Sequence, residues 1–218
     1  ALSKIDSRII DDIAVFKGPY SALYGPGLHF MDVQLQHSPR YENGFQAGGA
    51  TGVTYKMNGE QWRGRQALHG GAENWGFRFN YGHGVGDDYQ AGDGSEFPSS
   101  YKSREIDLAF GFDLTEGRTI EFNYLRLDQT DIEYPGQAFD MDYLVTDGFE
   151  LQYMSEEERF CDELLVEGWY NNTRFEGNAQ SAGKRQQFPF LNYIRYTGHT
   201  DVNSSSSGFR SAATWKSD

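Results

Sequence analysis

From about residue 44 onward, bulky apolar residues alternate with polar or small ones, which is the period of a β-strand. The clearest case is 106–114, where every bulky apolar residue falls on one face and Asp, Ala and Gly fall on the other. Residues 75–85 and 120–124 repeat the pattern, which weakens at 125–127, where the alternation slips. This period predicts an all-β, antiparallel fold whose sheet has two chemically different faces.

The alternation and its interruptions predict eight strands. They cover residues 45–57, 61–72, 75–86, 101–114, 118–130, 148–154, 160–173 and 208–217. Asn58-Gly59 is a hairpin signal between the first two strands, and Ser155–Glu158 separates the sixth from the seventh. The breaks after the third, fifth and seventh strands are long and polar: 87–100, 131–147 and 174–207. Apart from the first hairpin, short and long connections therefore alternate. No helix longer than a few turns is expected after residue 40.

Two architectures fit this pattern. A transmembrane β-barrel has short turns on one side, longer loops on the other, an apolar outward face and a polar lumen. A soluble β-sandwich also alternates, because one face of each sheet is buried. Several predicted strands exceed ten residues, which favours the barrel. Aromatic residues near strand ends would then suit the interfacial girdles: Trp62, Trp75, Tyr101, Trp169, Tyr170 and Trp215.

Composition excludes several classes of protein. The 218 residues carry 32 Asp and Glu against 19 Lys and Arg, a net charge of −13, so no nucleic-acid partner is expected. The single Cys161 excludes an internal disulfide framework and a cysteine zinc cluster. Apolar runs are far shorter than the roughly 20 residues of a transmembrane helix. There is no initiator Met or signal peptide, and we expect the chain to be a piece of a longer protein.

No arrangement of residues indicates catalysis or a resident metal or cofactor. The five histidines are scattered, and no nucleophile, phosphate-loop or zinc-protease motif occurs. Asp107 and Asp113 could serve acid–base chemistry, but lining a lumen explains them better. The acidic, glycine-rich stretch 86–96 offers oxygen ligands for calcium, yet it lacks the EF-hand spacing. A solvated loop is the better interpretation of that stretch.

Residues 1–40 differ from the rest of the chain. Four isoleucines recur at near-helical spacing: Ile5, Ile9, Ile10 and Ile13. Ala14–Phe16 and residues 30–35 are strand candidates. Ser21 could cap a short turn that Gly25 closes.

The segment from Ile13 to Gly27 resembles a known family. A strand, Ile13–Lys17, leads into Gly18-Pro19-Tyr20-Ser21-Ala22-Leu23-Tyr24-Gly25-Pro26-Gly27. This order and spacing is similar to the end of the plug domain of TonB-dependent outer-membrane receptors. The residues that carry the match, all with expected structural roles, are Gly18, Pro19, Ser21, Leu23, Tyr24, Gly25 and Gly27. After Gly27 the sequence departs from the commonest family pattern, which suggests a divergent branch.

The resemblance implies that residues 1–40 are the C-terminal end of a small α+β plug domain. Residues 41–218 would be about eight N-terminal strands of a larger transmembrane barrel, which in this class has about 22 strands. The implied function is energy-coupled uptake of a scarce nutrient across the outer membrane of a Gram-negative-type bacterium, by default a ferric siderophore. The implied partners are a TonB-type energy-transducing complex, whose contact segment lies outside this piece, outer-membrane lipid and a small-molecule substrate. The alternatives are a passive β-barrel pore and a soluble acidic β-sandwich adhesin.

The resemblance also implies an orientation. The plug would lie on the periplasmic side, so the three long connections would lie on the cell surface. Five acidic residues would then sit in the second long loop: Asp131, Glu133, Asp140, Asp142 and Asp147. Such a field disfavours a strongly anionic ligand. The ligand-contacting residues are not predicted.

Overall fold

The computed structural model describes residues 9–18, 29–158, 160–194 and 197–216. The chain divides into two compact units, Ala1–His37 and Ser38–Asp218. Each unit is described by itself. The assignment of residues 1–40 and 41–218 to a plug and a barrel stays a prediction.

The first unit contains an antiparallel hairpin of β1 (Ile10–Lys17) and β2 (His29–Leu35), in which Ile13 lies opposite Val33. The two strand predictions in this region are confirmed. The helical spacing of the isoleucines is misleading, because Ile10 and Ile13 lie in β1. Branched Ile and Val side chains favour strands, and this preference prevails here. Ile5 and the turn at 21–25 lie outside the described residues.

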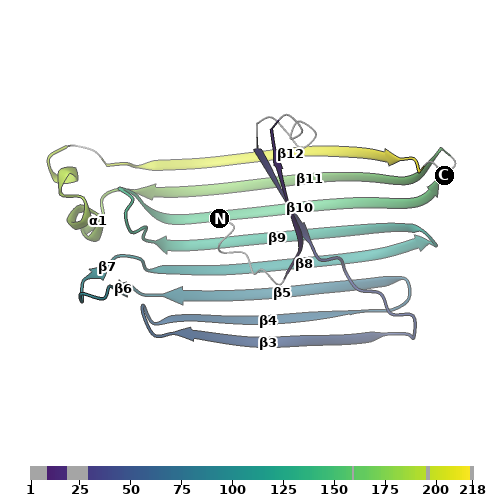
Figure 1. Cartoon of the computed structure of the whole chain (residues 1–218), viewed down its shortest axis with the longest axis horizontal. Coiled ribbons are helices and arrows are strands. Elements are labelled where there is room, and N and C mark those ends of the chain that lie inside the picture. Colours follow the sequence, from purple (N-terminus) through teal and green to yellow (C-terminus); the bar gives the residue numbers. More distant parts are fainter. Residues whose placement is uncertain (1–8, 19–28, 159, 195–196, 217–218) are drawn as a thin grey trace. The chain divides into compact units, whose positions relative to one another are not determined.

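The second unit is one antiparallel sheet of eight strands, each hydrogen-bonded to its neighbours along the sheet, in the order β12-β11-β10-β9-β8-β5-β4-β3 (Figure 1). The strands are β3 (Gln46–Lys56), β4 (Gln61–Gly71), β5 (Trp75–Gly86), β8 (Tyr101–Thr115), β9 (Arg118–Ile132), β10 (Asp140–Glu158), β11 (Cys161–Asn178) and β12 (Thr200–Thr214). The predicted all-β antiparallel fold and its number of strands are confirmed.

The last three strands are longer than predicted or displaced. β10 begins at Asp140 instead of 148, and it includes Ser155–Glu158, which were predicted to be the turn. β11 continues to Asn178, and β12 covers Thr200–Thr214 instead of 208–217. Three of the missed segments, 155–158, 174–178 and 200–207, are mostly polar and carry little alternation of apolar residues. In 140–147 the alternation is broken, because Tyr143, Leu144 and Val145 follow one another. They form strands because backbone ladder bonds do not depend on side-chain polarity.

The connections differ at the two ends of the sheet. At one end, which we call the loop end, they are residues 57–60, 87–100, 133–139 and 179–199. At the other, which we call the turn end, they are residues 72–74, 116–117 and 159–160. The hairpin predicted at Asn58-Gly59 is confirmed, and Gly59 adopts a φ of 75° that favours glycine. The second long loop is only 133–139 and the third only 179–199.

Short elements occupy the longer loops (Figure 1). The first contains a small hairpin of β6 (Tyr89–Gln90) and β7 (Glu96–Phe97). The last contains α1 (Ala182–Gln187), capped by the Ser181 side chain, and the 3-10 helix η4 (Pro189–Asn192). The prediction that no long helix follows residue 40 agrees with this. Among the described residues, no helix is long and apolar enough to cross a membrane.

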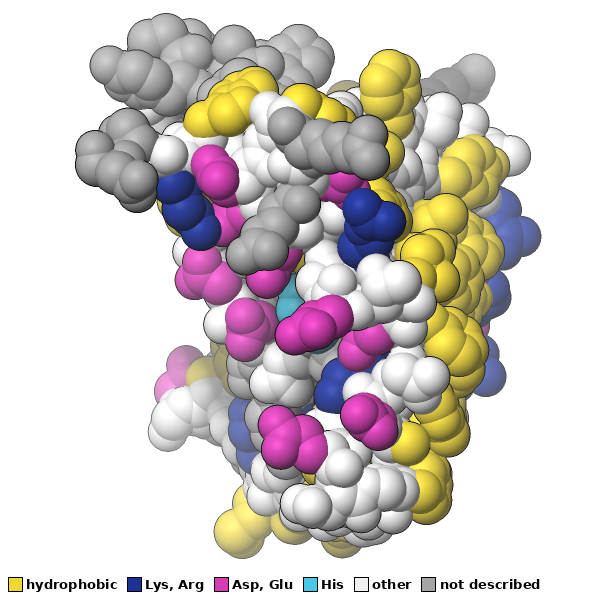
Figure 2. Space-filling model, turned by 90° about the vertical axis from the view of Figure 1, so that its right-hand side faces the viewer, with side chains coloured by type: hydrophobic (Ala, Val, Ile, Leu, Met, Phe, Trp, Pro, Cys, Tyr) yellow, Lys and Arg dark blue, Asp and Glu magenta, His cyan; other side chains and the backbone are white. Residues whose placement is uncertain are grey.

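The two faces of the sheet have opposite character. On β8 the apolar side chains are exposed, as at Phe112 (46 %), whereas Asp107 on the other face is almost fully buried (1 %). Cross-strand pairing continues this division: Phe110 lies opposite Phe77 and Phe122. We call these the apolar face and the polar face. Seen from the turn end, hydrophobic side chains form a column down one side of the molecule (Figure 2).

The register of β9 continues without a shift through 125–127, where the sequence pattern weakens. What changes there is the type of residue on each face. Leu125 lies opposite Asp107 on the polar face, while Arg126 lies opposite Ile106 on the apolar face. The aromatic girdle is only partly as predicted. Trp62, Trp75 and Tyr170 lie on the apolar face, opposite Val85, Phe112 and Phe149. Tyr101 and Trp169 lie on the polar face, opposite Gly86 and Glu150, so their assignment to the girdle was wrong.

Candidate functional site on the polar face and at the loop end

The signature residues of the sequence resemblance are mostly not among the residues that the structure describes. Gly18 is described, and its φ of 84° requires the conformational freedom of glycine. The other six lie outside the described residues: Pro19, Ser21, Leu23, Tyr24, Gly25 and Gly27. Their predicted structural roles stay predictions. The described functional surface is instead the polar face of the sheet and the loops at its loop end.

Paired charges line the polar face. Arg78 Nη1 lies 2.6 Å from Asp107 Oδ1, and the Asn80 amide donates to the same oxygen at 2.9 Å. Beside them, Arg63 pairs with Glu105 at 2.6 Å. Pairing of this kind is what allows charged groups to be buried. Asp107 is therefore held in an ion pair, which agrees with the interpretation that it lines a lumen.

Some polar atoms on the polar face could make further hydrogen bonds. Within the described residues, Arg78 Nε and Nη2 and Asp107 Oδ2 are buried and make no hydrogen bond to the protein. Buried polar atoms in native proteins are usually satisfied by protein or by ordered water. The polar face therefore has the character of a surface that contacts water or a polar ligand, and not that of an apolar core.

At the turn end, a short segment is fixed to the polar face. We call Ser38–Arg40 the anchor segment. Both carboxylate oxygens of Glu121 accept hydrogen bonds from Ser38. The Arg40 guanidinium binds both carboxylate oxygens of Asp113 at 3.0 Å. Sequence analysis missed this contact, because nothing in the local pattern links residues that lie 83 positions apart.

Room for the anchor segment comes from two glycines. A Cβ atom at Gly111 would collide with the Glu121 carboxylate and the Ser38 hydroxyl. A Cβ atom at Gly76 would collide with the carbonyl oxygen of Pro39. The absence of side chains at both positions lets the backbone of the segment approach the sheet closely.

At the loop end, the second and third longer loops are joined through Lys184. Its side chain is fully buried, and its Nζ lies 2.9 Å from Asp140 Oδ1 and donates to the carbonyl of Tyr134 at 2.6 Å. The other oxygen of Asp140 accepts from the Ser181 hydroxyl at 2.7 Å. One buried ion pair with its hydrogen bonds therefore connects residues 133–139 to residues 179–199.

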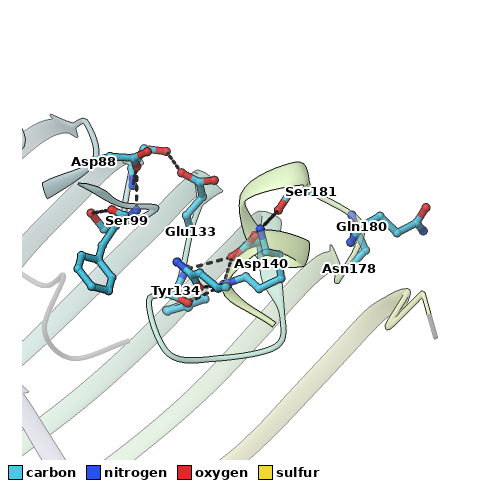
Figure 3. A network of polar contacts seen from close by, with 12 residues as sticks. Asp88, Ser99, Glu133, Tyr134, Asp140, Asn178, Gln180 and Ser181 are labelled. Carbon is cyan, nitrogen blue, oxygen red and sulfur yellow. Dashed lines mark hydrogen bonds and ion pairs between the residues drawn. The ribbon is translucent and has the colours of Figure 1, made fainter. Parts of the chain in front are cut away.

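The first longer loop joins the same network through a pair of carboxyl groups. Asp88 Oδ1 accepts from the backbone amides of Ser99 and Ser100 at 2.8 and 3.0 Å. Glu133 faces Asp88 (Figure 3) and accepts from the Ser100 hydroxyl at 2.8 Å. Burial, together with the neighbouring Asp88 and Asp140 carboxyls, raises the pKa of Glu133, although the Ser100 hydrogen bond opposes this. The Glu133 carboxyl therefore holds its proton more tightly than an ordinary glutamate does.

The acidic loop is built from its own hydrogen bonds. Asp93 Oδ1 accepts from the backbone amide of Ser95 at 2.9 Å, and the hydrogen bonds from Ser95 lower the pKa of Asp93. An open hollow of about 460 Å³ adjoins this loop and is lined by Met57, Asn58, Gly59, Asp88, Gln90 and Glu96. Across the described residues, no group of three or more His, Cys, Asp or Glu could hold a metal ion.

Most of the acidic residues expected in the second long loop lie instead in the strands that flank it, β9 and β10. Of the five acidic residues assigned to it, only Glu133 lies in residues 133–139. Asp140, Asp142 and Asp147 lie in β10, where Asp147 Oδ1 is 2.8 Å from Arg126 Nη1. The prediction was wrong because β10 begins earlier than the apolar pattern indicated.

Three solved structures share this fold. The copper transporter OprC superposes with a TM-score of 0.82 at 22 % identity, covering 99 % of this chain and 33 % of its own. The FrpB iron transporter from Neisseria meningitidis superposes with a TM-score of 0.61 at 13 % identity. The match covers 94 % of this chain and 34 % of the transporter. The ferric enterobactin receptor PfeA, from Pseudomonas aeruginosa, superposes with a TM-score of 0.58 at 15 % identity. The match covers 95 % of this chain and 33 % of the receptor. These structures are TonB-dependent receptors.

The chain has the fold of part of a TonB-dependent receptor. It spans about a third of the length of the solved structures that it matches. No known family matches the sequence, and no curated protein matches it. The receptor fold agrees with the prediction of about eight antiparallel strands from a larger barrel.

Proposed function

We propose that the chain belongs to an outer-membrane TonB-dependent receptor, with residues 1–40 as the end of its plug and 41–218 as its first barrel strands. The observation that carries the proposal is the exposed apolar face of a sheet that has this receptor fold. On β8 the apolar row runs from Ile106 to Leu114. At about 3.3 Å per residue it is about 26 Å long, and at a strand tilt of about 35–45° it would span about 18–21 Å of the roughly 25 Å apolar band of transmembrane barrels.

The connections support one orientation in the membrane. Outer-membrane barrels have short periplasmic turns and longer extracellular loops. The turn end would therefore face the periplasm and the loop end the cell surface. The anchor segment lies at the turn end, as expected if the chain passes from a periplasmic plug into the first strand, β3. The network around Lys184 would then hold the extracellular loops together.

The proposed activity is energy-coupled uptake of a metal-containing nutrient, by default a ferric siderophore. Support comes from the similar structures, which are a copper transporter, an iron transporter and a ferric enterobactin receptor. A TonB-type complex would be the energy-transducing partner.

The two alternatives make different predictions. A soluble sandwich needs a second sheet of similar size against the apolar face, whereas the described residues form one eight-stranded sheet and two small two-stranded ones. A passive pore would share the barrel but would admit solutes without energy. Energy dependence is thus the property that separates the receptor from the pore.

The test uses the full-length protein in cells that lack other receptors for the tested complexes. We expect the protein in the outer-membrane fraction, extractable only with detergent. Uptake of at least one radiolabelled metal complex should require the protein, and should stop when the TonB-type complex is deleted or the proton gradient is collapsed. Uptake that persists without energy would favour the pore, and recovery in detergent-free buffer would refute the membrane assignment.

A further inference from the structure

The chain passes from the first unit to the second through a single residue, His37. On the side of the first unit, the Gln36 amide donates to the carbonyl of Ile9 at 2.9 Å, which extends the pairing of β1 with β2. On the side of the second unit, the Ser38 amide donates to Glu121 Oε1 at 2.7 Å. His37 lies between these two bonds and is exposed. Tension along the backbone therefore leaves the first unit at its hairpin and enters the second at the anchor segment.

The hairpin of the first unit would be loaded at its open end. Ile10 and Leu35 are partners at that end. The chain continues from Ile10 toward the N-terminus and from Leu35 toward the anchor segment. A pull from the N-terminal side would therefore separate the two strands pair by pair, so that the hydrogen bonds of one pair carry the load at a time. A two-stranded hairpin is only marginally stable in water, and we expect it to open at low force.

The anchor segment is fastened by several bonds that share the load. Arg40 binds both carboxylate oxygens of Asp113, and Glu121 accepts two hydrogen bonds from Ser38. Arg40 Nη1 also donates to the carbonyl and the hydroxyl of Ser38, at 3.0 and 2.8 Å, which joins the two attachments. Hydrogen bonds to charged groups are stronger than those between neutral groups. A pull that passes this point must therefore break both attachments, one on β8 and one on β9.

Beyond the anchor segment, the next large attachment is β3. The Tyr41 amide donates to the carbonyl of Ala72 at 3.1 Å, and residues 42–45 are exposed. The first pair of β3 with β4 is Gln46 with Gly71. Tension that passed the anchor segment would load β3 from this end, again one pair at a time. The anchor segment thus lies where it can protect the first strand of the sheet.

We propose that the anchor segment is a mechanical stop. A pull from the N-terminal side opens the hairpin of β1 and β2, the opening ends at Ser38, and β3 keeps its place in the sheet. The first unit and the sheet are then separate cooperative units of unfolding. The use of this stop in the cell rests on the proposed function, in which a TonB-type complex acts on the chain from the plug side. The mechanical property itself depends only on the contacts within each unit.

The test pulls single molecules of the full-length protein in lipid bilayers by force spectroscopy. The handle is attached at Asp11→Cys, an exposed position at the open end of the hairpin. A Cys161→Ser background removes the other thiol of this chain. In the native anchor, the first event should release the chain from the handle to Ser38, about 27 residues or about 90 Å of extended chain. A second event at higher force should follow.

Two variants and a matched control identify the residues that form the stop. Arg40→Gln with Glu121→Ala removes both attachments, so the first event should continue toward Gln46, about 8 residues or about 26 Å further. Arg40→Lys keeps the charge but loses the bidentate fork, so it should keep the released length and lower the force of the second event. Arg118→Gln with Glu158→Ala removes an ion pair of 3.1 Å between β9 and β10, and should match the native protein.

A native protein whose first event passes Ser38 would overturn the inference, as would a double variant that releases the native length. Heat-modifiable migration reports folding of each barrel. If the double variant does not fold, Arg40→Lys decides, because an unchanged force for its second event would also overturn the inference. Uptake of a metal complex by a protein without the stop would refute this inference alone. A protein that shows the stop but needs no energy for uptake would refute the proposed function alone.

Discussion

The carboxylate of Glu121 holds Ser38 at two points, through the backbone amide at 2.7 Å and the hydroxyl at 2.9 Å. Both residues are buried, and they are 83 positions apart in the sequence. Arg40 adds a second attachment through Asp113, and Arg40 Nη1 also donates to the Ser38 hydroxyl at 2.8 Å. The start of the second unit is therefore fixed to β8 and β9 before the chain enters β3.

Removing this carboxylate should loosen the anchor segment. In Glu121→Ala, the buried amide and hydroxyl of Ser38 lose their acceptor, at a cost of about 1–3 kcal/mol. Hydrogen exchange of the full-length protein should then increase in the peptide that contains residues 38–41, with little change in β10. Glu116→Ala, an exposed turn residue at the same end, is the control. Unchanged exchange in the Glu121 variant would show that Arg40 and Asp113 hold the segment alone.

Alternation along the chain was enough to predict the number of strands and the faces of β5 and β8. From Trp75 to Tyr81 and from Ile106 to Leu114, every second residue is bulky and apolar, so the period is visible without tertiary information. It failed in β12, whose residues Asn203–Ser207 are polar on both faces. They form a strand because they pair with β11, where Ser206 lies opposite Asn171 and the Asn172 amide donates to Asn203 at 3.0 Å. Pairing of this kind depends on the partner strand and leaves no local signal.

The site was predicted less well than the fold, for a related reason. Asp107 and Asp113 were correctly expected on the polar face, because alternation reports on which face a residue lies. Their partners Arg78 and Arg40 were not predicted, since a cross-strand or long-range partner depends on register. Lys184 gave no signal either, because a lysine in a polar loop is ordinarily exposed.

A positive charge should be costly on the apolar face and tolerated on the polar face of the same strand. Leu151 is 54 % exposed on the apolar face, and its neighbour Gln152 points to the polar face opposite Glu121 and Glu167. If the apolar face contacts lipid, Leu151→Arg should destabilise the full-length protein by about 2–4 kcal/mol near the midplane. Gln152→Arg should cost much less, because two carboxylates face it. Denaturant unfolding in lipid vesicles measures both, and equal costs would contradict the lipid-facing assignment.

The contact between Asp88 and Glu133 should weaken as pH rises. The raised pKa of Glu133 means that its folded-state carboxyl holds a proton more tightly than an unfolded one. Its contribution to loop order is therefore complete below the ordinary glutamate pKa and is lost as pH rises through the raised value. Hydrogen-exchange protection factors, which correct for the intrinsic pH dependence of amide exchange, should be higher in residues 87–100 and 133–139 at pH 4 than at pH 8.

A substitution separates this carboxyl pair from other pH effects. Glu133→Gln keeps a donor toward Asp88 at every pH, so the loops should stay protected at pH 8. Glu96→Gln, on β7 in the same loop region, is the control and should retain the native pH dependence. The groups that face Glu133 are Asp88, Asp140 and the Ser100 hydroxyl. If Glu133→Gln showed the same low protection factors as the native protein at pH 8, the proton on Glu133 would not be what orders these loops.

The two ends of the sheet should differ in their access to protease on intact cells. Gly94 and Gly136 lie in connections at the loop end, and both have positive φ in open surroundings, where an added Cβ meets nothing within 4 Å. Gly117 lies in the short turn at the other end. Protease sites inserted in the full-length protein after Gly94 or Gly136 should be cut from outside, and a site after Gly117 only when the outer membrane is permeabilised. Exposed loop tips accept such insertions with little loss of stability. Cutting at Gly117 in intact cells, with protection at the other two sites, would reverse the orientation and separate the chain's first unit from the periplasm.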